Sequence, residues 1–218
     1  MTHVFWDWNG TLLDDTQAAL DTLNIMLARR RGRSIAMDYY RDHSAFPVKP
    51  FYKSIGVCLE NEDWDALARE YHDVYAEQPK RLNPEAVAAL KRVHAAGARQ
   101  SIVSALRQDL LEAALDEFGV RGFFAHVCGV DNLDGLSKID RAKELFALVR
   151  TEDSAADIVI IGDALHDKEV ADALGVRCVL CAQGSHAAWR LRAVAPTGDT
   201  LMDALDIALS PGRGPANG

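Results

Sequence analysis

Four polar residues, widely separated along the chain, could together transfer a phosphoryl group: Asp7, Ser104, Lys138 and Asp163. A carboxylate can attack phosphorus, and a second carboxylate can share a divalent cation with it. A hydroxyl, a lysine and the backbone N–H groups of a glycine turn can hold the charged oxygens of the transferred group. This set therefore predicts phosphoryl-transfer chemistry, provided that the fold brings the residues together.

Three of the four residues follow short segments that predict strands. The segments at 4–6, 99–103 and 157–161 lead to Asp7, Ser104 and Asp163, respectively, and the first and third are apolar runs. The third run is apolar almost throughout, which is typical of a strand covered on both faces. Because the carboxyl ends of parallel strands meet at one edge of a sheet, these polar groups are expected to line one crevice.

Strands and helices alternate from residue 83 onward, which predicts an α/β fold with a parallel, Rossmann-like sheet and helices on both faces. The patterns predict two further strands, at 123–128 and 177–181. Helices are predicted at 14–30, 63–77, 83–97, 108–118, 137–149, 167–174 and 200–209.

Residues 14–80 interrupt this alternation and are expected to form a separate, mainly helical cap. The core would then comprise residues 1–13 and 81–209, and the tail 210–218 would be disordered. Residues 34–60 are predicted to be irregular, since two prolines prevent one long helix there. Asp14 and Asp15 are expected to cap the first helix of the unit.

The composition argues against large polyanionic partners. The 218 residues include 24 Lys and Arg against 32 Asp and Glu, and the net charge of −8 disfavours nonspecific binding to nucleic acid or anionic membranes. No apolar run approaches the roughly 20 residues of a membrane span, and no signal peptide is recognisable. Cys178 and Cys181 would point to opposite faces of one strand, so they predict no zinc site. We expect a cytoplasmic monomer or homodimer.

The polar motifs resemble those of the haloacid dehalogenase superfamily of aspartate-nucleophile phosphohydrolases. Residues Asp7–Thr11 match the first motif, Asp-x-Asp-Gly-Thr, except at its third position. Ser104 matches the second motif and Lys138 the third, while residues Gly162–Asp167 match the fourth, Gly-Asp-x-x-x-Asp. The insertion resembles the helical cap of the phosphoglycolate phosphatase-like subgroup, so the resemblance covers nearly the whole chain.

This resemblance implies a role for each matching residue. Asp7 would attack phosphorus and form an aspartyl-phosphate. Mg²⁺ would be held by Asp7, the backbone carbonyl of Asn9 and Asp163, with Asp167 as a further ligand or a hydrogen-bond acceptor behind it. The phosphate would be held by Gly10, Thr11, Ser104, Ala105 and Lys138. Simpler roles remain open, because Ser104 and Asp167 could cap helices and Asp163 could be a turn acid.

The chain departs from the first motif at Asn9, where the family has an aspartate that protonates the leaving group and then activates water. An amide cannot do this, and general acid–base catalysis contributes about 10²- to 10⁴-fold. Three outcomes are open: the substrate has a leaving group that needs little protonation, such as an acyl phosphate, a pyrophosphate or an aryl phosphate; His43 or His166 supplies the proton; or the protein binds phosphate with little turnover.

A cap that closes over the site would also select the substrate. Arg41, His43 and Lys49 lie among aromatic residues and could pair with a carboxylate on a small substrate such as phosphoglycolate. The alternative is that the aromatic residues pack within the cap and leave these charges exposed.

The sequence therefore predicts a Mg²⁺-dependent phosphohydrolase of a small phosphorylated metabolite. Two alternatives remain. A non-catalytic phosphate-binding or regulatory protein of the same fold would explain Asn9. A phosphotransferase or mutase would use the same aspartyl-phosphate but pass it to an acceptor other than water.

Overall fold

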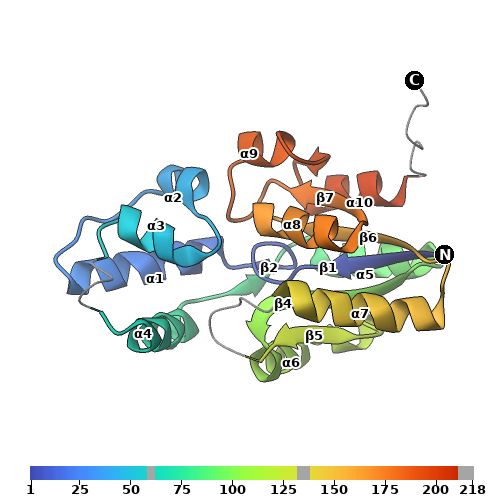
Figure 1. The fold of residues 1–218 in the computed structure, drawn as a ribbon, viewed down its shortest axis with the longest axis horizontal. Coiled ribbons are helices and arrows are strands. Elements are labelled where there is room, and N and C mark those ends of the chain that lie inside the picture. The colour runs from blue at the N-terminus through green and yellow to red at the C-terminus, as the bar shows by residue number, and fades with distance from the viewer. Residues whose placement is uncertain (58–61, 132–137, 211–218) are drawn as a thin grey trace.

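The computed structural model describes residues 1–57, 62–131 and 138–210, and in these a six-stranded sheet forms the centre of the larger part of the chain (Figure 1). Its strand order is β5-β4-β1-β6-β7-β8, and every neighbouring pair is parallel. The strands are β1 (Thr2–Trp6), β4 (Arg99–Arg107), β5 (Val127–Val130), β6 (Asp157–Gly162), β7 (Arg177–Cys181) and β8 (Thr197–Gly198).

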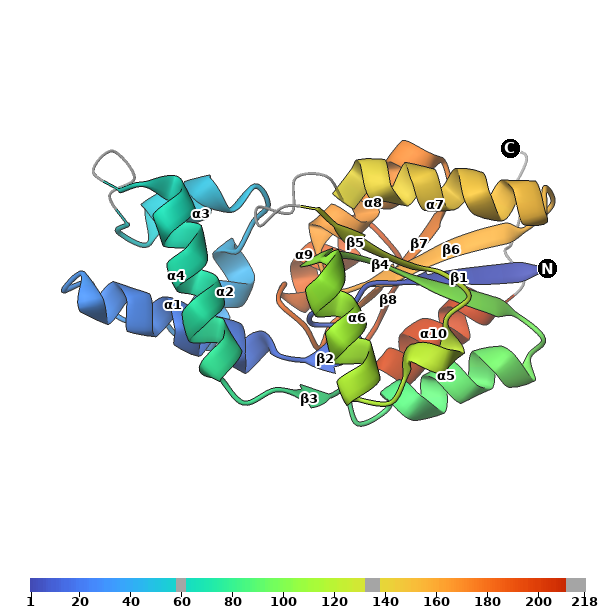
Figure 2. The same ribbon diagram turned by 90° about the horizontal axis from the view of Figure 1, so that it is seen from below.

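Helices cover both faces of this sheet (Figure 2). One face packs against α5 (Ala86–Ala95), α6 (Gln108–Glu117) and α10 (Leu201–Leu209), and the other against α7 (Lys138–Glu152), α8 (Leu165–Leu174) and the short α9 (Ala188–Arg192). The predicted α/β class with a parallel sheet is confirmed.

Successive side chains of the central strands enter opposite cores. Val4 and Trp6 pack on the α5 side and Phe5 on the α7 side, which explains why the strand is apolar at consecutive positions. Cys181 and Cys178 likewise belong to opposite cores, as predicted from their spacing.

The second part of the chain is a group of four helices beside the carboxyl edge of the sheet (Figure 1). These are α1 (Thr16–Arg29), α2 (Met37–His43), α3 (Val48–Ser54) and α4 (Trp64–Glu77), here called the cap. They share a hydrophobic cluster of their own, which includes Met26, Leu27, Phe51 and Leu67. The paired strands β2 (Leu13–Asp14) and β3 (Arg81–Leu82) carry the chain into and out of the cap. The division into 1–13 with 81–209 and 14–80 remains a prediction.

The expectation that residues 34–60 are irregular is wrong, because α2 and α3 lie there. Pro47 precedes α3 and Pro50 lies in its first turn, where a helix needs no backbone N–H donor. The prolines therefore separate two short helices instead of preventing helix formation.

Smaller differences concern short or irregular segments. The strand expected at 123–128 is shorter, since Arg121–Phe123 form a 3₁₀ turn and β5 begins at Val127. The strand expected at 99–103 continues to Arg107. The elements α9, β2, β3 and β8 are only two to five residues long and were not predicted. Ser137, where the helix at 137–149 was expected to begin, and residues 211–218 of the tail lie outside the described residues. No helix in the described ranges is long and apolar enough to cross a membrane.

Candidate active site

Asp7 and Asp163 lie side by side because they directly follow two neighbouring strands. The register pairs Trp6 of β1 with Ile161 of β6, and the Asp7 N–H continues the ladder by donating to the Ile161 carbonyl at 2.9 Å. Ser104 lies on β4, the neighbour of β1 on its other side. The structure thus brings these three predicted site residues to one edge of the sheet.

Lys138 joins the end of β1 to the start of helix α8 through its ammonium group. It is buried at the first position of α7, and its Nζ donates to Asp7 Oδ1 at 2.5 Å and to Asp167 Oδ1 at 2.7 Å. The other oxygen of Asp167 accepts from the backbone N–H groups of Asp163 and Ala164 at 3.1 and 3.0 Å. Asp167 therefore caps the start of α8 and also pairs with Lys138.

The Asp163 carboxylate is held by the loop that follows β7. Its Oδ2 accepts from both the backbone N–H and the hydroxyl of Ser185, each at 2.6 Å. A Cβ atom at Gly10, which has φ of +77°, or at Gly184 would collide with this carboxylate. Glycine at both positions lets the backbone approach the acid closely.

Burial controls the ionisation of this cluster. It raises the pKa of Asp7 well above its ordinary value of 3.8, and it raises the pKa of Asp163 to about 7, with the charge of Asp167 adding to the effect. Burial would raise the pKa of Asp167 as well, but the positive charge and hydrogen bond of Lys138 lower it overall. Burial alone would lower the pKa of Lys138, but the two carboxylates raise it, so the lysine stays charged.

The acidic residues fit a divalent cation. One oxygen each from Asp7, Asp163 and Asp167 lie within 4.8 Å of one another, and all three side chains are buried. Against three carboxylates the cluster has one ammonium group, so full ionisation leaves two negative charges without compensation. Hard oxygen ligands and this charge suit Mg²⁺. The expected contribution of the Asn9 carbonyl stays a prediction.

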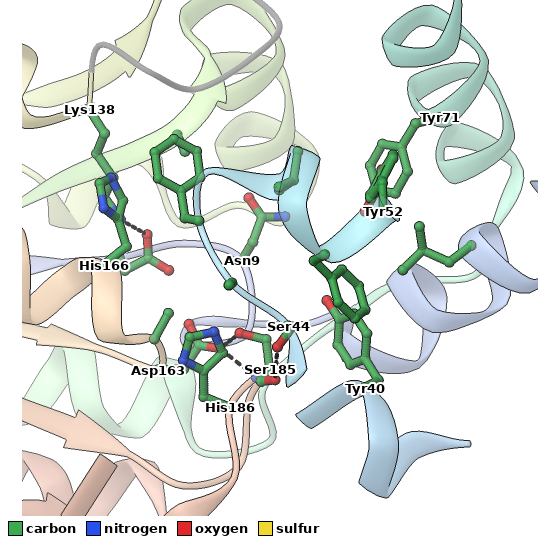
Figure 3. Close-up of a pocket in the computed structure, with 18 of the residues that line it drawn as sticks. Asn9, Tyr40, Ser44, Tyr52, Tyr71, Lys138, Asp163, His166, Ser185 and His186 are labelled. Atoms are coloured by element: carbon green, nitrogen blue, oxygen red, sulfur yellow. Dashed lines mark hydrogen bonds and ion pairs between the residues drawn. The ribbon is translucent and has the colours of Figure 1, made fainter. Parts of the chain in front are cut away.

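A cavity of about 300 Å³ lies between this cluster and the cap. Figure 3 shows Lys138, Asp163 and His166 on its core side, and Tyr40 and Tyr71 on its cap side. Asp7, Ser104 and Ala105 also line it, and the Ser104 oxygen accepts from the Leu106 N–H at 3.1 Å, which leaves the hydroxyl hydrogen to donate. A phosphate group there would meet the lysine and the Ser104 hydroxyl.

Asn9 also lines the cavity, but its amide bonds Asp15, just before α1, and Tyr75 of α4. Its Nδ2 donates to Asp15 Oδ2 at 2.7 Å and to the Tyr75 hydroxyl oxygen at 3.0 Å. Tyr75 in turn donates to Asp15, and the other Asp15 oxygen accepts from the Gly10 N–H at 2.6 Å. Asn9 is therefore a hydrogen-bond donor to a buried carboxylate.

These contacts correct the expectation that Asp14 and Asp15 cap the first helix. Asp15 occupies the N-cap position of α1, but its side chain makes no cap hydrogen bond because it turns back toward Asn9. Asp14 pairs with Arg81 at 2.9 Å across β2 and β3. The side chains of Asp14 and Asp15 thus bond residues outside α1 instead of the N–H groups at the start of that helix.

The backbone N–H groups expected to hold phosphate at Gly10 and Thr11 are also engaged within the protein. Gly10 donates to Asp15, and the Thr11 N–H donates to the Trp8 carbonyl at 3.3 Å. The Thr11 hydroxyl instead lies 3.4 Å from a carboxylate oxygen of Asp7 and 3.4 Å from one of Asp163.

The three cap cations expected to select the substrate are not brought together, and none of them lines the cavity in the described part of the chain. His43 is exposed and stacks on Tyr39, while the Lys49 ammonium lies 4.5 Å above the centre of the Trp64 ring. Arg41 donates to the carbonyls of Gln183 and Gly184 at 3.1 and 3.0 Å. Arg41 therefore fastens the cap to the loop after β7.

Some residues of the site were missed by the sequence reasoning. Ser185 and His186 follow the end of β7, so the position of that strand end at the same sheet edge could have indicated them. Burial lowers the pKa of His186 to about 4, so it is neutral near pH 7, and its Nδ1 accepts from the Leu165 N–H. Tyr75 is 66 residues from Asn9, and no local pattern indicates that contact.

Comparison with known proteins finds a matching family model and similar sequences. A family model described as haloacid dehalogenase-like hydrolase matches residues 4–181. The chain is 25% identical over 224 residues to a phosphoglycolate phosphatase of Pseudomonas putida, which covers 99% of this chain and 81% of that relative. It is 26% identical over 202 residues to a Dickeya dadantii protein named "Probable phosphatase IndB", covering 88% of this chain and 86% of the relative.

A solved structure shares the fold. The crystal structure of a predicted phosphatase from Clostridium acetobutylicum superposes with a TM-score of 0.77, over 96% of this chain and 99% of that one. Only 16% of the aligned residues are identical, so the similarity concerns the arrangement of strands and helices.

Magnesium should raise the midpoint of thermal unfolding, and by more at pH about 8 than at pH about 6. In the folded protein Asp163 has a pKa of about 7, against 3.8 ordinarily. Without a cation, stability therefore falls as pH rises from about 4 to about 7, since the folded state must release a proton that the unfolded chain has already lost. The ion relieves the repulsion between carboxylates and competes with that proton.

The measurement is a thermal melt with and without MgCl₂ at both pH values. Asp163→Asn should reduce the magnesium shift and its pH dependence, whereas Asp172→Asn, which changes an exposed acid on the same helix α8, should leave both unchanged. Equal magnesium shifts for the parent protein and Asp163→Asn would contradict this assignment.

Proposed function

The chain belongs to the haloacid dehalogenase-like hydrolase family, and on that premise we propose that it is a Mg²⁺-dependent phosphatase acting through an aspartyl-phosphate on Asp7. The observation that carries the proposal is the position of Asp7. It lines the cavity, and its carboxylate is bound to a buried lysine and lies beside two further acids. The phosphatases among its relatives support the same reaction class.

In the proposed reaction, an Asp7 oxygen attacks phosphorus while the bond from phosphorus to the leaving oxygen breaks. Lys138 holds Asp7 and neutralises part of the charge on the phosphoryl oxygens, and the Ser104 hydroxyl donates to one of them. Water then attacks phosphorus, which releases inorganic phosphate and returns the Asp7 carboxylate. A Mg²⁺ ion held by the acidic cluster would supply further charge neutralisation for the phosphoryl oxygens.

Asn9 removes the usual proton donor from the first step. Its amide has no acidic proton, and its Nδ2 is held by Asp15 and Tyr75. Of the two histidines expected as substitutes, His166 lines the cavity, whereas His43 is exposed and bonded to the Tyr39 carbonyl. The reaction therefore favours leaving groups that depart as stable anions.

The proposed substrate is a small phosphorylated metabolite. The name of the Pseudomonas relative suggests phosphoglycolate, but none of the cations expected to pair with its carboxylate lines the cavity in the described part of the chain. The cytoplasmic location and the monomeric or dimeric state remain predictions.

Asp7→Asn should lower kcat for phosphate release from p-nitrophenyl phosphate by more than about a thousandfold, because the amide cannot attack phosphorus. Asp14→Asn is the matched control, since Asp14 makes only a partly exposed ion pair with Arg81. In the parent protein, mass spectrometry after an acid quench should find phosphate on the peptide that contains Asp7. Activity that persists in Asp7→Asn would refute the proposed nucleophile.

Restoring the missing acid should require two substitutions. Asn9→Asp alone places a second carboxylate against the buried Asp15, which repels it and lowers stability at neutral pH. The pair Asn9→Asp/Asp15→Asn keeps the net charge: the amide at position 15 can donate to the new acid and still accept from the Gly10 N–H. We expect the pair to raise kcat on benzyl phosphate, whose leaving group needs a proton, by about 10²-fold.

The measurements are the thermal unfolding midpoint and kcat on benzyl phosphate for the parent protein and for the single and double variants. If the single variant is as stable and as active as the double variant, the contact with Asp15 does not control the acid at position 9.

A further inference from the structure

The cap side of the cavity is lined by aromatic rings from α2, α3, α4 and the segment between α2 and α3. They are Tyr40, Phe46, Phe51, Tyr52, Trp64 and Tyr71. The rings support one another, because Tyr40 and Phe51 have centroids 5.9 Å apart, as do Tyr52 and Trp64. This wall therefore presents fixed aromatic surfaces to whatever occupies the cavity.

Polar atoms on this wall lack partners within the described residues. The hydroxyl groups of Tyr40, Tyr52 and Tyr71, labelled in Figure 3, make no hydrogen bond to another described residue, and burial raises the pKa of each. They therefore stay protonated and can donate. On the core side, the His166 ring packs at a tilt against Phe46 with ring centroids 4.2 Å apart, and its buried Nε2 has no partner in the described part of the chain.

The wall is poor in positive charge. No arginine lines the cavity among the described residues, and the one lysine that does, Lys138, is bound to Asp7 and Asp167. A carboxylate or a second phosphate buried against this wall would have no arginine and no uncommitted lysine to pair with among the described residues. This argues against phosphoglycolate-like acids and against pyrophosphates.

Building on the proposed function, we propose that the substrate is a phosphate monoester of an aromatic hydroxyl compound, with the phosphate at Asp7 and the ring against the cap. Two independent observations point to it. A flat aromatic ring with little charge fits against the aromatic wall, and the tyrosine hydroxyls can donate to polar substituents on that ring. Asn9, engaged by Asp15, leaves the reaction without its usual acid, which such an ester does not need.

The chemistry of the leaving group follows. When an Asp7 oxygen forms its bond to phosphorus, the aryl oxygen keeps the electron pair of the broken bond and departs as a phenolate. A phenol ionises at about 10, far more readily than water at about 15.7. The phenolate therefore leaves without a proton from the enzyme and takes one from solvent afterwards.

Four substrates separate the contribution of the ring from that of the leaving group. Phenyl phosphate has both the ring and a good leaving group, benzyl phosphate has the ring alone, acetyl phosphate has the good leaving group alone, and ethyl phosphate has neither. We expect phenyl phosphate to have the highest kcat/KM. Its KM should be about tenfold or more below that of acetyl phosphate, and its kcat about 10²-fold above that of benzyl phosphate.

The outcomes separate this inference from the proposed function. If none of the four substrates releases phosphate above the level seen with Asp7→Asn, the proposed phosphatase function fails. If acetyl or ethyl phosphate matches phenyl phosphate in kcat/KM, the protein is a phosphatase but the inferred aromatic substrate is wrong.

A variant pair on α4 locates the ring. Ala68 lines the cavity beside the aromatic wall, so Ala68→Phe should fill the space for the ring and lower the ratio of kcat/KM for phenyl to acetyl phosphate by about tenfold or more. Ala66→Phe makes the same change at an exposed position of the same helix and should leave the ratio within about twofold. An unchanged ratio in Ala68→Phe would overturn the placement of the ring.

Discussion

A buried excess of negative charge at one edge of the sheet is the constraint on which the rest of the site depends. Three carboxylates lie within 4.8 Å of one another, and Lys138 is the cation bonded to two of them. Such a cluster is costly unless a ligand completes it. The parallel register of β1 and β6 holds Asp7 and Asp163 together, and the packing of α7 and α8 on one face of the sheet brings Lys138 to Asp167.

The loop that holds Asp163 also connects the core to the cap. The loop after β7 holds Asp163 through Ser185, and its carbonyls accept from Arg41 and from the Ser44 hydroxyl at 2.9 Å. A second connection joins Asn9, which follows β1, to Asp15 and to Tyr75 of α4. Core and cap are thus joined at two places beside the cavity, and the loop at one of them also holds an acid of the cluster.

The parts of this arrangement that follow from regular structure could be predicted from the sequence. Asp7 and Asp163 end apolar runs, and a parallel sheet necessarily brings such ends to one edge. The side chains of Asp15 and Arg41 could not be placed, because their partners are distant in sequence. Asp15 has the spacing of a helix cap, yet Gly10, Asn9 and Tyr75 bind its oxygens. Arg41 is a cation among aromatic residues, yet two backbone carbonyls of the core bind it.

The central claim is that Asp7 carries the phosphoryl group beside a cation shared with Asp163. The most direct test is a crystal structure of the protein with MgCl₂ and beryllium fluoride, which mimics a phosphoryl group bound to a carboxylate. The account predicts beryllium joined to an Asp7 oxygen, fluorine atoms next to Lys138 and Ser104, and the ion in contact with Asp7 and Asp163. Beryllium fluoride bound elsewhere, or a magnesium ion that touches neither acid, would contradict it.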